Sequence, residues 1–482
     1  MISFIVCILI LVIGYFTYGK LMEKIFGVEP ERQTPALRMQ DDVDYLPLPT
    51  WKIFLIQFLN IAGLGPIFGA IAGAMYGPSA FLWIVLGSVF GGAVHDYFSG
   101  MMSVRHDGLS ISEVVGIYLG VGAKQVMRLF SIVLLIFVGT VFLMGPAKII
   151  DGMTGHMWNV WVWVAIILGY YILSTLLPID KVISKLYPIF GTAMLCMALG
   201  LMIALFFGDY QIPELTPANL VNMSQNPEET PIFPMLFITI ACGAISGFHA
   251  TQSPLMARCL KNETKGRRVF YGAMITEGIV ALVWAAAAMV FFGNVGGLND
   301  AMAENSNNAA WAANEISVNM LGKVGGILAL LGIVFAPITS GDTAFRSTRL
   351  ILADIFTFNQ ASLKNRLILS IPLFVIAFVL TQIDFDIIWR YFAWSNQTLA
   401  TITLWTITAY LYAKHKWYMV TLLPAIFMTM VCSTYILIAP EGFQLDHGLS
   451  YWIGGVITFV SPFGFFWYAS NKRKKGLAAD MG

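Results

Sequence analysis

Runs of apolar residues, each about 20 residues long, recur along the whole chain and alternate with short polar stretches. A run of this length can cross the hydrocarbon core of a membrane as a helix. The polar stretches between the runs leave no room for a separate soluble domain. The pattern predicts an all-α integral membrane protein with about thirteen spanning helices, at residues 2–18, 53–76, 79–104, 126–147, 158–177, 186–208, 233–256, 269–292, 324–344, 367–382, 386–411, 417–438 and 449–469.

Two of these runs are interrupted by glycine and proline at corresponding places in the two halves of the chain. Residues 53–76 are broken at Ala62–Pro66, and residues 233–260 are broken at Gly243–Pro254. Unwound backbone is tolerated at membrane depth only where it is buried in protein or lines a watery cavity. A matched pair of interrupted helices is typical of the substrate site of a secondary transporter.

The positions of the breaks divide the membrane core into two blocks of five helices, each beginning with its interrupted helix. Because five is an odd number, the second block enters the membrane from the opposite side, which is the geometry of an inverted repeat. Two amphipathic stretches, Ser110–Gly120 and Ala309–Leu321, are expected at the interface or packed on the bundle. The predicted divisions are a leading helix and loop, the first block, a connection, the second block, and two trailing helices with a basic tail, at residues 1–50, 51–208, 209–232, 233–411 and 412–482.

Basic residues are concentrated on alternate connections. If the segments alternate sides, all of the 28 Lys and Arg residues except Lys148, Lys323 and Arg390 lie on one side. The connection at residues 209–231, on the other side, contains acids and no Lys or Arg. Cytoplasmic loops carry such an excess, so we expect a cell (inner) membrane protein with its N-terminus outside and its C-terminus in the cytoplasm. No basic residue precedes the first apolar run, which favours a retained helix over a signal peptide.

The composition agrees with a membrane protein and excludes several other classes. Hydrophobic residues make up 58% of the chain and charged residues 11%, and the mean hydropathy is +0.75. A net charge of +1 argues against nucleic acid as a partner. The five cysteines are scattered and form no disulfide framework or CxxC pair. The chain has no GxxxxGK[ST] motif of an ATP-driven pump and no HExxH or GxSxG motif of an intramembrane enzyme.

The first break offers mainly backbone to a substrate. Asn60, Gly63 and Gly65 are the candidate binding residues here. Pro66 frees carbonyl groups that suit a cation, and the N–H groups that begin the next half-helix suit a carboxylate. The alternative is a continuous helix whose glycines allow close packing. Pro66 favours the unwound interpretation, because close packing alone does not need it.

The second break adds polar side chains to an apolar span. A helix here would turn several of them towards lipid, so we expect an unwound segment that faces a cavity. His249 can change charge near neutral pH and so relay a proton; alternatively it is a neutral histidine bonded to a backbone carbonyl. Asn396 either lines the cavity or joins helices. The other candidate substrate-binding residues are Ser246, Phe248, Thr251, Gln252, Ser253 and Trp394.

Three carboxylates lie inside predicted spans: Asp96, Glu277 and Asp342. A charged group in hydrocarbon is costly, so each is a functional candidate. Glu277 lies near the middle of its span, where a carboxyl group can hold the coupling proton. Asp96 follows His95, and this pair is expected to be structural or to act in gating. No motif spacing supports a metal site built from the histidines and a carboxylate, and no cofactor is expected.

Several motifs together resemble the carbon starvation protein A family, in the same order along nearly the whole membrane core. They are Gly65-Pro66 with Ala93–Tyr97, Ser103–Arg105, Gly108–Ser110, Cys242–Thr251, Ser340–Arg346 and Phe392–Ala400. The resemblance implies a LeuT-like fold of the amino acid–polyamine–organocation superfamily. It also implies import of peptides or pyruvate, with proton coupling.

The same resemblance implies an ion site. Thr339, Ser340, Asp342 and Thr343 fall where LeuT-like carriers bind sodium, opposite the first break. Asp342 there could be neutralised by sodium or by a proton, or it could instead pair with Arg346 one turn away. The sequence therefore predicts a symporter for a small carboxylate-bearing nutrient, with H⁺ as the coupling cation and Na⁺ as the alternative. The alternatives are a sodium-coupled amino-acid carrier and an intramembrane enzyme or sensor. The expected partners are a small-molecule substrate and the lipid bilayer.

Overall fold

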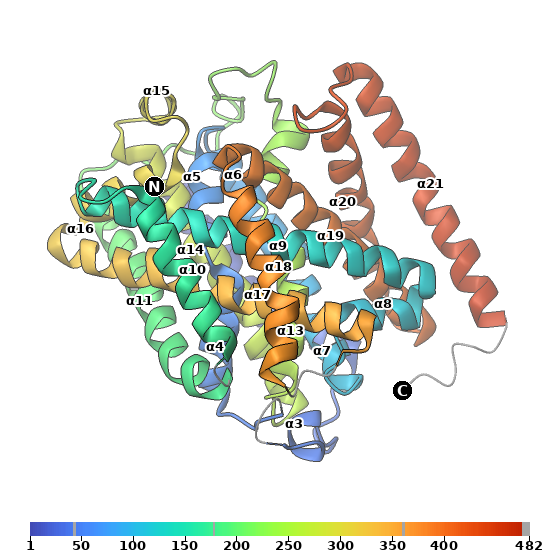
Figure 1. Cartoon of the computed structure of the whole chain (residues 1–482). Coiled ribbons are helices and arrows are strands. Elements are labelled where there is room, and N and C mark those ends of the chain that lie inside the picture. The colour runs from blue at the N-terminus through green and yellow to red at the C-terminus, as the bar shows by residue number, and fades with distance from the viewer. Residues whose placement is uncertain (42–44, 177–178, 359–361, 475–482) are drawn as a thin grey trace.

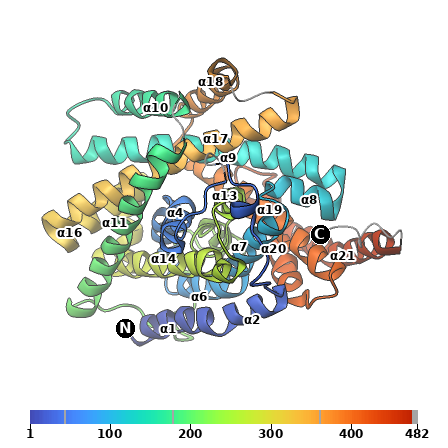
Figure 2. The same cartoon turned by 90° about the horizontal axis from the view of Figure 1, so that it is seen from below.

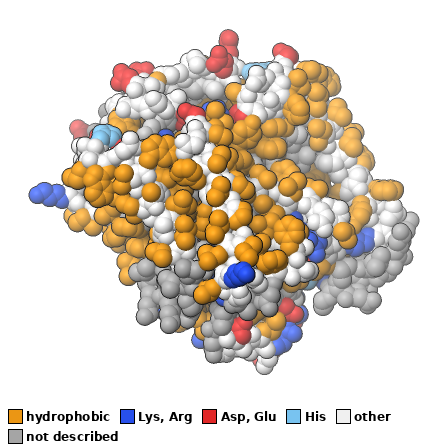
Figure 3. Space-filling model, viewed as in Figure 1, with side chains coloured by type: hydrophobic (Ala, Val, Ile, Leu, Met, Phe, Trp, Pro, Cys, Tyr) orange, Lys and Arg blue, Asp and Glu red, His pale blue; other side chains and the backbone are white. Residues whose placement is uncertain are grey.

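The computed structural model describes residues 1–41, 45–176, 179–358 and 362–474 (Figure 1). The end of the predicted span 158–177 and the last residues of the predicted basic tail, 475–482, lie outside the described residues. Hydrophobic side chains cover a broad band of the surface, and acidic side chains are visible at both ends of the molecule beyond this band (Figure 3). Such a band is expected of a protein that is embedded in a membrane.

Helices account for all the regular elements in the described part of the chain. In hydrocarbon a helix satisfies the hydrogen bonds of its backbone internally, which explains this preference. The elements of the first half are α1 (Ile2–Phe16), α2 (Tyr18–Phe26), α3 (Pro35–Arg38), α4 (Thr50–Ala62), η1 (Gly65–Gly69), α5 (Ala70–Ala74), α6 (Ser79–Leu86), η2 (Gly87–Gly92), α7 (Ala93–Arg105), α8 (Ile111–Leu119), α9 (Val121–Met153), α10 (Val160–Leu176) and α11 (Ile179–Phe207).

The second half repeats this alternation of long, broken and short helices. Its elements are η3 (Ile232–Leu236), α12 (Phe237–Thr239), α13 (Gly247–Ala257), η4 (Glu263–Lys265), η5 (Arg267–Tyr271), α14 (Gly272–Phe291), α15 (Val295–Glu304), α16 (Ala309–Ala329), η6 (Leu330–Phe335), α17 (Ala336–Phe356), α18 (Leu363–Leu380), α19 (Phe385–Ala413), α20 (Met419–Ile438) and α21 (His447–Lys474).

The number of helices able to span a membrane can be counted by length and hydropathy. Among the described residues, nine helices pass this test, and α4 with η1 and α5 forms a further, bent pair. The remaining predicted spans, 158–177, 233–256 and 386–411, coincide with α10, the broken α12–α13 segment and α19. The chain is therefore a multi-pass membrane protein, and the number thirteen stays a prediction.

Four helices form the centre of the molecule. Seen from below, α4, α7, α13 and α14 lie together and the other helices surround them (Figure 2). Helices α9 and α17 pack against each other on one side, with α10 and α18 beyond them, and α1 and α2 cover the opposite side. Helix α21 packs on α20 at the edge. The central helices are thus shielded from the surroundings on every side.

The two ends of the molecule differ in their polar groups. We call the end formed by the connection 208–231 the loop face; here the N-terminal ammonium group bonds to Glu214 at 2.5 Å. We call the opposite end the basic face. There the guanidinium of Arg105 donates to the buried carboxylate of Glu263 at 2.6 and 2.8 Å, which ties α7 to η4. The backbone N–H of Glu29 donates to the same carboxylate at 2.9 Å.

The first predicted break is present, and it is short. Helix α4 ends at Ala62, and Gly63 has a φ of +40°, in the region that favours glycine. The chain restarts as the π-helical turn η1, with Pro66 in its first turn. The two parts are bent by 54° relative to each other. The unwound interpretation of this segment is confirmed.

The second break is also present, but its predicted extent is wrong. The chain leaves helical geometry after Thr239 and resumes at Gly247, so His249 to Ser253 lie on α13 and not in an unwound segment. The prediction assumed that a helix would expose these polar groups to lipid. Helix α13 avoids this cost because α4, α7, α9 and α19 pack around it.

Both amphipathic stretches form helices. The first is α8, and the second is the beginning of α16. A kink at Gly322, where φ is +61°, separates Ala309–Leu321 from the rest of α16. An amphipathic helix therefore precedes a long helix in each half of the core.

Candidate functional site

The two breaks lie against each other in the middle of the molecule. A Cβ atom added to Gly65 would lie 2.1 Å from the Cβ of Cys242, so the first break approaches the second closely. A Cβ added to Gly243, which has a φ of +90°, would lie 3.6 Å from the Cα of Pro66. Only glycine fits at Gly65 without displacing the other break. The two interrupted helices therefore form one contiguous site.

An aromatic pair links this site to α9. The ring of Phe142, on α9, lies directly over Gly63 and meets the ring of Phe248 edge to face, with centroids 6.3 Å apart. A side chain at position 63 would collide with this ring, at 2.5 Å from its added Cβ. Phe142 thus contacts both the first break and the first turn of α13.

Asn396 on α19 holds the second break in place. Its Oδ1 accepts hydrogen bonds from the backbone N–H of Phe248 at 2.7 Å and from the hydroxyl of Ser246 at 3.1 Å. Its amide nitrogen also lies 3.4 Å from the sulfur of Cys242. In this structure the first turn of α13 is therefore capped by a side chain, and Asn396 joins α19 to the break.

Four ionisable side chains, which we call the acid–imidazole chain, run through the buried centre. They are His95 and Asp96 on α7, His249 on α13 and Glu277 on α14, and all four are fully buried. Asp96 lies between the two imidazoles, 2.7 Å from Nδ1 of His95 and 2.8 Å from Nδ1 of His249. Nε2 of His249 faces Oε2 of Glu277 at 3.4 Å.

The geometry of this chain suits the holding and passing of a proton. Two N–H donors can satisfy Asp96 as a carboxylate, which fixes the Nδ1 proton of His249 and directs its Nε2 at Glu277. Among the described residues, neither oxygen of Glu277 has a hydrogen-bond donor in good geometry. An unpaired buried charge is costly. A proton shared between Nε2 of His249 and the Glu277 carboxyl lowers this cost, and it can lie on either group.

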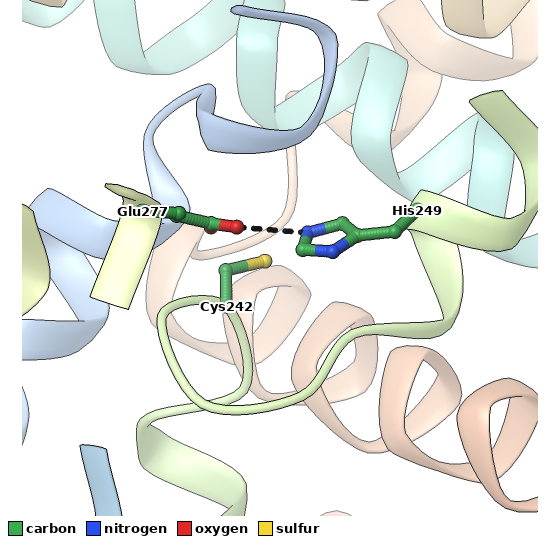
Figure 4. Close-up of side chains that lie close together, drawn as sticks. All are labelled: Cys242, His249 and Glu277. Carbon is green, nitrogen blue, oxygen red and sulfur yellow. Dashed lines mark ion pairs between the residues drawn. The ribbon is translucent and has the colours of Figure 1, made fainter. Parts of the chain in front are cut away.

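Cys242 adds a sulfur atom beside this pair. Figure 4 shows Cys242, His249 and Glu277 converging from three segments, with ligand atoms within 4.8 Å of one another. A transition metal would require the thiolate. The Cys242 sulfur also lies 3.5 Å from the Ser246 hydroxyl oxygen and 3.4 Å from the Asn396 amide nitrogen.

The third carboxylate predicted inside a span, Asp342, is also buried and lies in a separate cluster on α17. It accepts from the hydroxyl of Ser174 at 2.6 Å and lies 3.6 Å from Arg346. The ion pair with Arg346, the alternative for this residue, is therefore present. Ser340 reaches the first break, where its hydroxyl donates to the Leu59 carbonyl at 3.3 Å. The hydroxyls of Thr339 and Thr343 donate to backbone carbonyls of their own helix.

The other candidates contribute less to the contacts between the breaks. Asn60 is buried on α4, just before the first break. Trp394 points away from the breaks, since its Nε1 donates to the Cys432 carbonyl on α20 at 3.1 Å. Thr251 and Ser253 donate to carbonyls within their own helix, and Gln252 donates to Thr251.

A cavity of about 400 Å³ lies between the breaks and the loop face. Its lining includes Phe68 at the end of the first break, Thr239 at the start of the second, and Trp389 and Arg390 on α19. Sequence reasoning did not select these residues. One signal was available: Arg390 is one of the few basic residues on the side of the molecule opposite the basic loops.

Comparison with solved structures identifies the class of fold. A manganese transporter of Eremococcus coleocola aligns with 90% of this chain and 99% of its own, with a TM-score of 0.57 and 12% identity. Mhp1 in an inward-facing conformation aligns with 87% of this chain and 91% of its own, with a TM-score of 0.52 and 13% identity. The chain has the LeuT-like fold of these transporters.

Comparison of sequences identifies the family. The model of the carbon starvation protein CstA family matches residues 1–174 and 153–324, and the chain belongs to this family. An uncharacterized membrane protein of Haemophilus influenzae is 45% identical over 349 residues, which is 63% of this chain and 94% of that protein.

Named relatives are more distant. The peptide transporter CstA of Helicobacter pylori is 29% identical over 56% of this chain and 48% of its own length. The pyruvate/proton symporter BtsT of Escherichia coli is 26% identical over 56% of this chain and 46% of its own length. The chain thus spans about half the length of the named relatives. These relatives are transporters, and the chain is a membrane transporter and not an enzyme.

Proposed function

We propose that the chain is a secondary active transporter that imports a small carboxylate-bearing nutrient, a short peptide or pyruvate, in symport with protons. The names of the relatives support these two substrate classes, and the relative named as a pyruvate/proton symporter supports the coupling ion. The proposal includes no bound cofactor and no metal.

The observation that carries proton coupling is the acid–imidazole chain beside the breaks. Glu277 is the proposed proton carrier, because it is fully buried and faces a histidine whose other nitrogen is fixed by Asp96. Protonation of Glu277 removes a buried charge next to the second break. Substrate binding and protonation thereby act on the same moving segment.

The orientation follows from the distribution of basic residues. We place the loop face outside the cell (inner) membrane and the basic face in the cytoplasm. The cavity then lies on the outer side of the breaks. Asp96 lies in the half of the continuous span Ser79–Arg105 that ends at Arg105, so the acid–imidazole chain extends from the breaks towards the cytoplasmic side. The interrupted helices would rock between the two open states.

Uptake by proteoliposomes under an imposed pH gradient, with and without sodium, tests the proposal. We expect acceleration by the pH gradient and no requirement for sodium. Glu277→Gln should abolish proton-driven uptake and spare substrate exchange, since exchange needs no net proton movement. Uptake that responds to neither the pH gradient nor the sodium gradient would contradict symport. Unchanged driven uptake in Glu277→Gln would move the role of proton carrier to Asp342.

A sodium-coupled amino-acid carrier is the second candidate. The observation in its favour is the approach of Ser340 to the Leu59 carbonyl, which brings oxygen atoms of α17 and the first break together. Uptake that requires sodium and is indifferent to the pH gradient would favour this candidate. Ser340→Ala would then abolish driven uptake, whereas a proton symporter should tolerate it.

A further inference from the structure

The cavity on the loop face contains a cationic group that the acid–imidazole chain does not use. Arg390 lies near the start of α19, lines the cavity and is 40% exposed. Within the described residues, its hydrogen bonding is limited to Nε, which donates to the Glu441 carboxylate at 3.2 Å. The two terminal nitrogens of the guanidinium are thus available to a ligand. The terminal N–H groups of a guanidinium can donate two parallel hydrogen bonds to the two oxygens of a carboxylate.

The partner of Arg390 is itself rigidly held. The Glu441 side chain is only 2% exposed, and its other oxygen accepts from the Tyr435 hydroxyl at 2.5 Å. The Tyr391 hydroxyl bonds to the Glu441 backbone carbonyl at 2.9 Å. Two tyrosines therefore fix the carboxylate that orients the guanidinium. A guanidinium whose orientation is already fixed loses less side-chain conformational entropy when it binds a ligand.

The rest of the cavity wall indicates what the ligand carries besides its carboxylate. The other ionisable lining residues include the acids Glu229 and Asp386, which repel a simple anion and attract an amine. Phe68 and Trp389 supply an apolar wall, with ring centroids 5.7 Å apart. The volume of about 400 Å³ lies in the usual range for small-ligand sites.

We propose that this cavity is an entry site for a zwitterionic substrate, in which Arg390 anchors the carboxylate and Glu441 positions Arg390. The inference rests on the proposed function, because it names the substrate class that the same transporter admits. Phe68 and Thr239 belong to the segments next to the two breaks. A ligand held at Arg390 is therefore beside both moving helices before it reaches the acid–imidazole chain. The site favours an amine-bearing carboxylate over a monocarboxylate such as pyruvate.

Equilibrium binding of radiolabelled dialanine to the purified full-length chain tests this site. Arg390→Gln should weaken binding about 10- to 100-fold, the usual effect of losing hydrogen bonds between charged groups. Dialanine amide, which lacks the carboxylate, should compete weakly and equally for wild type and Arg390→Gln. Pyruvate should compete less well than dialanine. Lys323→Gln, which removes an exposed charge elsewhere, is the matched control and should bind as wild type does.

A second variant guards against misfolding, since Arg390→Gln leaves Glu441 buried without its partner. Arg390→Gln/Glu441→Gln removes both charges and should bind dialanine as weakly as the single variant. Equal binding of dialanine by wild type and either Arg390 variant would contradict the proposal that Arg390 binds the substrate carboxylate. Absence of dialanine binding to wild type would contradict the proposed entry site. Pyruvate that competes as well as dialanine would contradict the preference for an amine-bearing carboxylate. Proton-driven uptake measured on the same preparations tests the proposed function separately, so the two failures are distinguishable.

Discussion

Replacement of Asp96 by asparagine tests whether the acid–imidazole chain works as a connected unit. The Asp96 carboxylate accepts hydrogen bonds from two imidazoles, at 2.7 and 2.8 Å. Asparagine keeps one acceptor oxygen and turns an N–H group towards the other imidazole. That imidazole must then present a lone pair at Nδ1 and carry its proton on Nε2. For His249, this change places a fixed N–H opposite Glu277.

The size of the effect follows from the hydrogen bond that is lost. A hydrogen bond to a charged group contributes about 1.5–3 kcal/mol, and asparagine retains one of the two. The population of the working tautomer should therefore fall about 10- to 150-fold. Proton-driven uptake should fall by at least tenfold, while substrate exchange, which moves no net proton, should change far less.

The assay is the ratio of driven uptake to exchange in proteoliposomes that contain equal amounts of protein. Asp151→Asn is a matched control, because Asp151 also pairs with a histidine, His156, at 2.8 Å. His156 is 78% exposed, so water can replace this contact. The control should keep the wild-type ratio. If Asp96→Asn has the same ratio as Asp151→Asn, the acid–imidazole chain does not carry the coupling proton.

Three further predictions concern the contact between the breaks and the two faces. Gly65→Ala places a methyl group 2.1 Å from the Cβ of Cys242 and should lower stability by about 1–3 kcal/mol and slow uptake. The control Gly169→Ala, in open space, should do neither. Recovery of uptake in Gly65→Ala/Cys242→Gly would identify the clash as the cause, and normal uptake by Gly65→Ala would contradict it. Glu263→Gln leaves Arg105 without its buried anion and should lower the free energy of unfolding by about 3 kcal/mol. The control is Glu304→Gln, at an exposed site. Equal melting temperatures for Glu263→Gln and Glu304→Gln would refute this prediction. Hydrogen bonds from the N-terminal ammonium and Ser3 lower the pKa of Glu214 to about 2, so its stabilisation is present above the unfolded pKa near 4.5 and is lost as the pH falls towards 2. Because the pair is partly exposed, the effect is at most about 1 kcal/mol, and a difference in melting temperature between wild type and Glu214→Gln that persists at pH 2 would contradict the assignment.

The sequence was sufficient to predict the breaks, because glycine and proline leave a local signature in an apolar run. The extent of the second break was not predictable in this way. Whether His249 to Ser253 can remain helical depends on what covers α13, and that is decided by α4, α7, α9 and α19, which lie far away in the sequence. Local polarity alone favoured an unwound segment.

The buried carboxylates were recognisable one by one, but their partners were not. Asp96 and His249 are 153 residues apart, and no spacing rule connects them. Asp96 was therefore assigned to gating or structure, separately from His249 and Glu277. In the sequence, Arg390 stood out only as one of the few basic residues on the side of the membrane opposite the basic loops. Its role became apparent when the fold placed Glu441, from the turn after α20, against its Nε.

The most direct test of the central claim records proton movement during substrate entry. Proteoliposomes with a pH-sensitive dye in the lumen receive an inward gradient of dialanine or pyruvate, with no pH gradient imposed. The account predicts that the lumen acidifies as substrate enters through the wild-type protein, and that Glu277→Gln exchanges substrate without acidification. Substrate entry through the wild-type protein at constant luminal pH would contradict proton symport through the acid–imidazole chain.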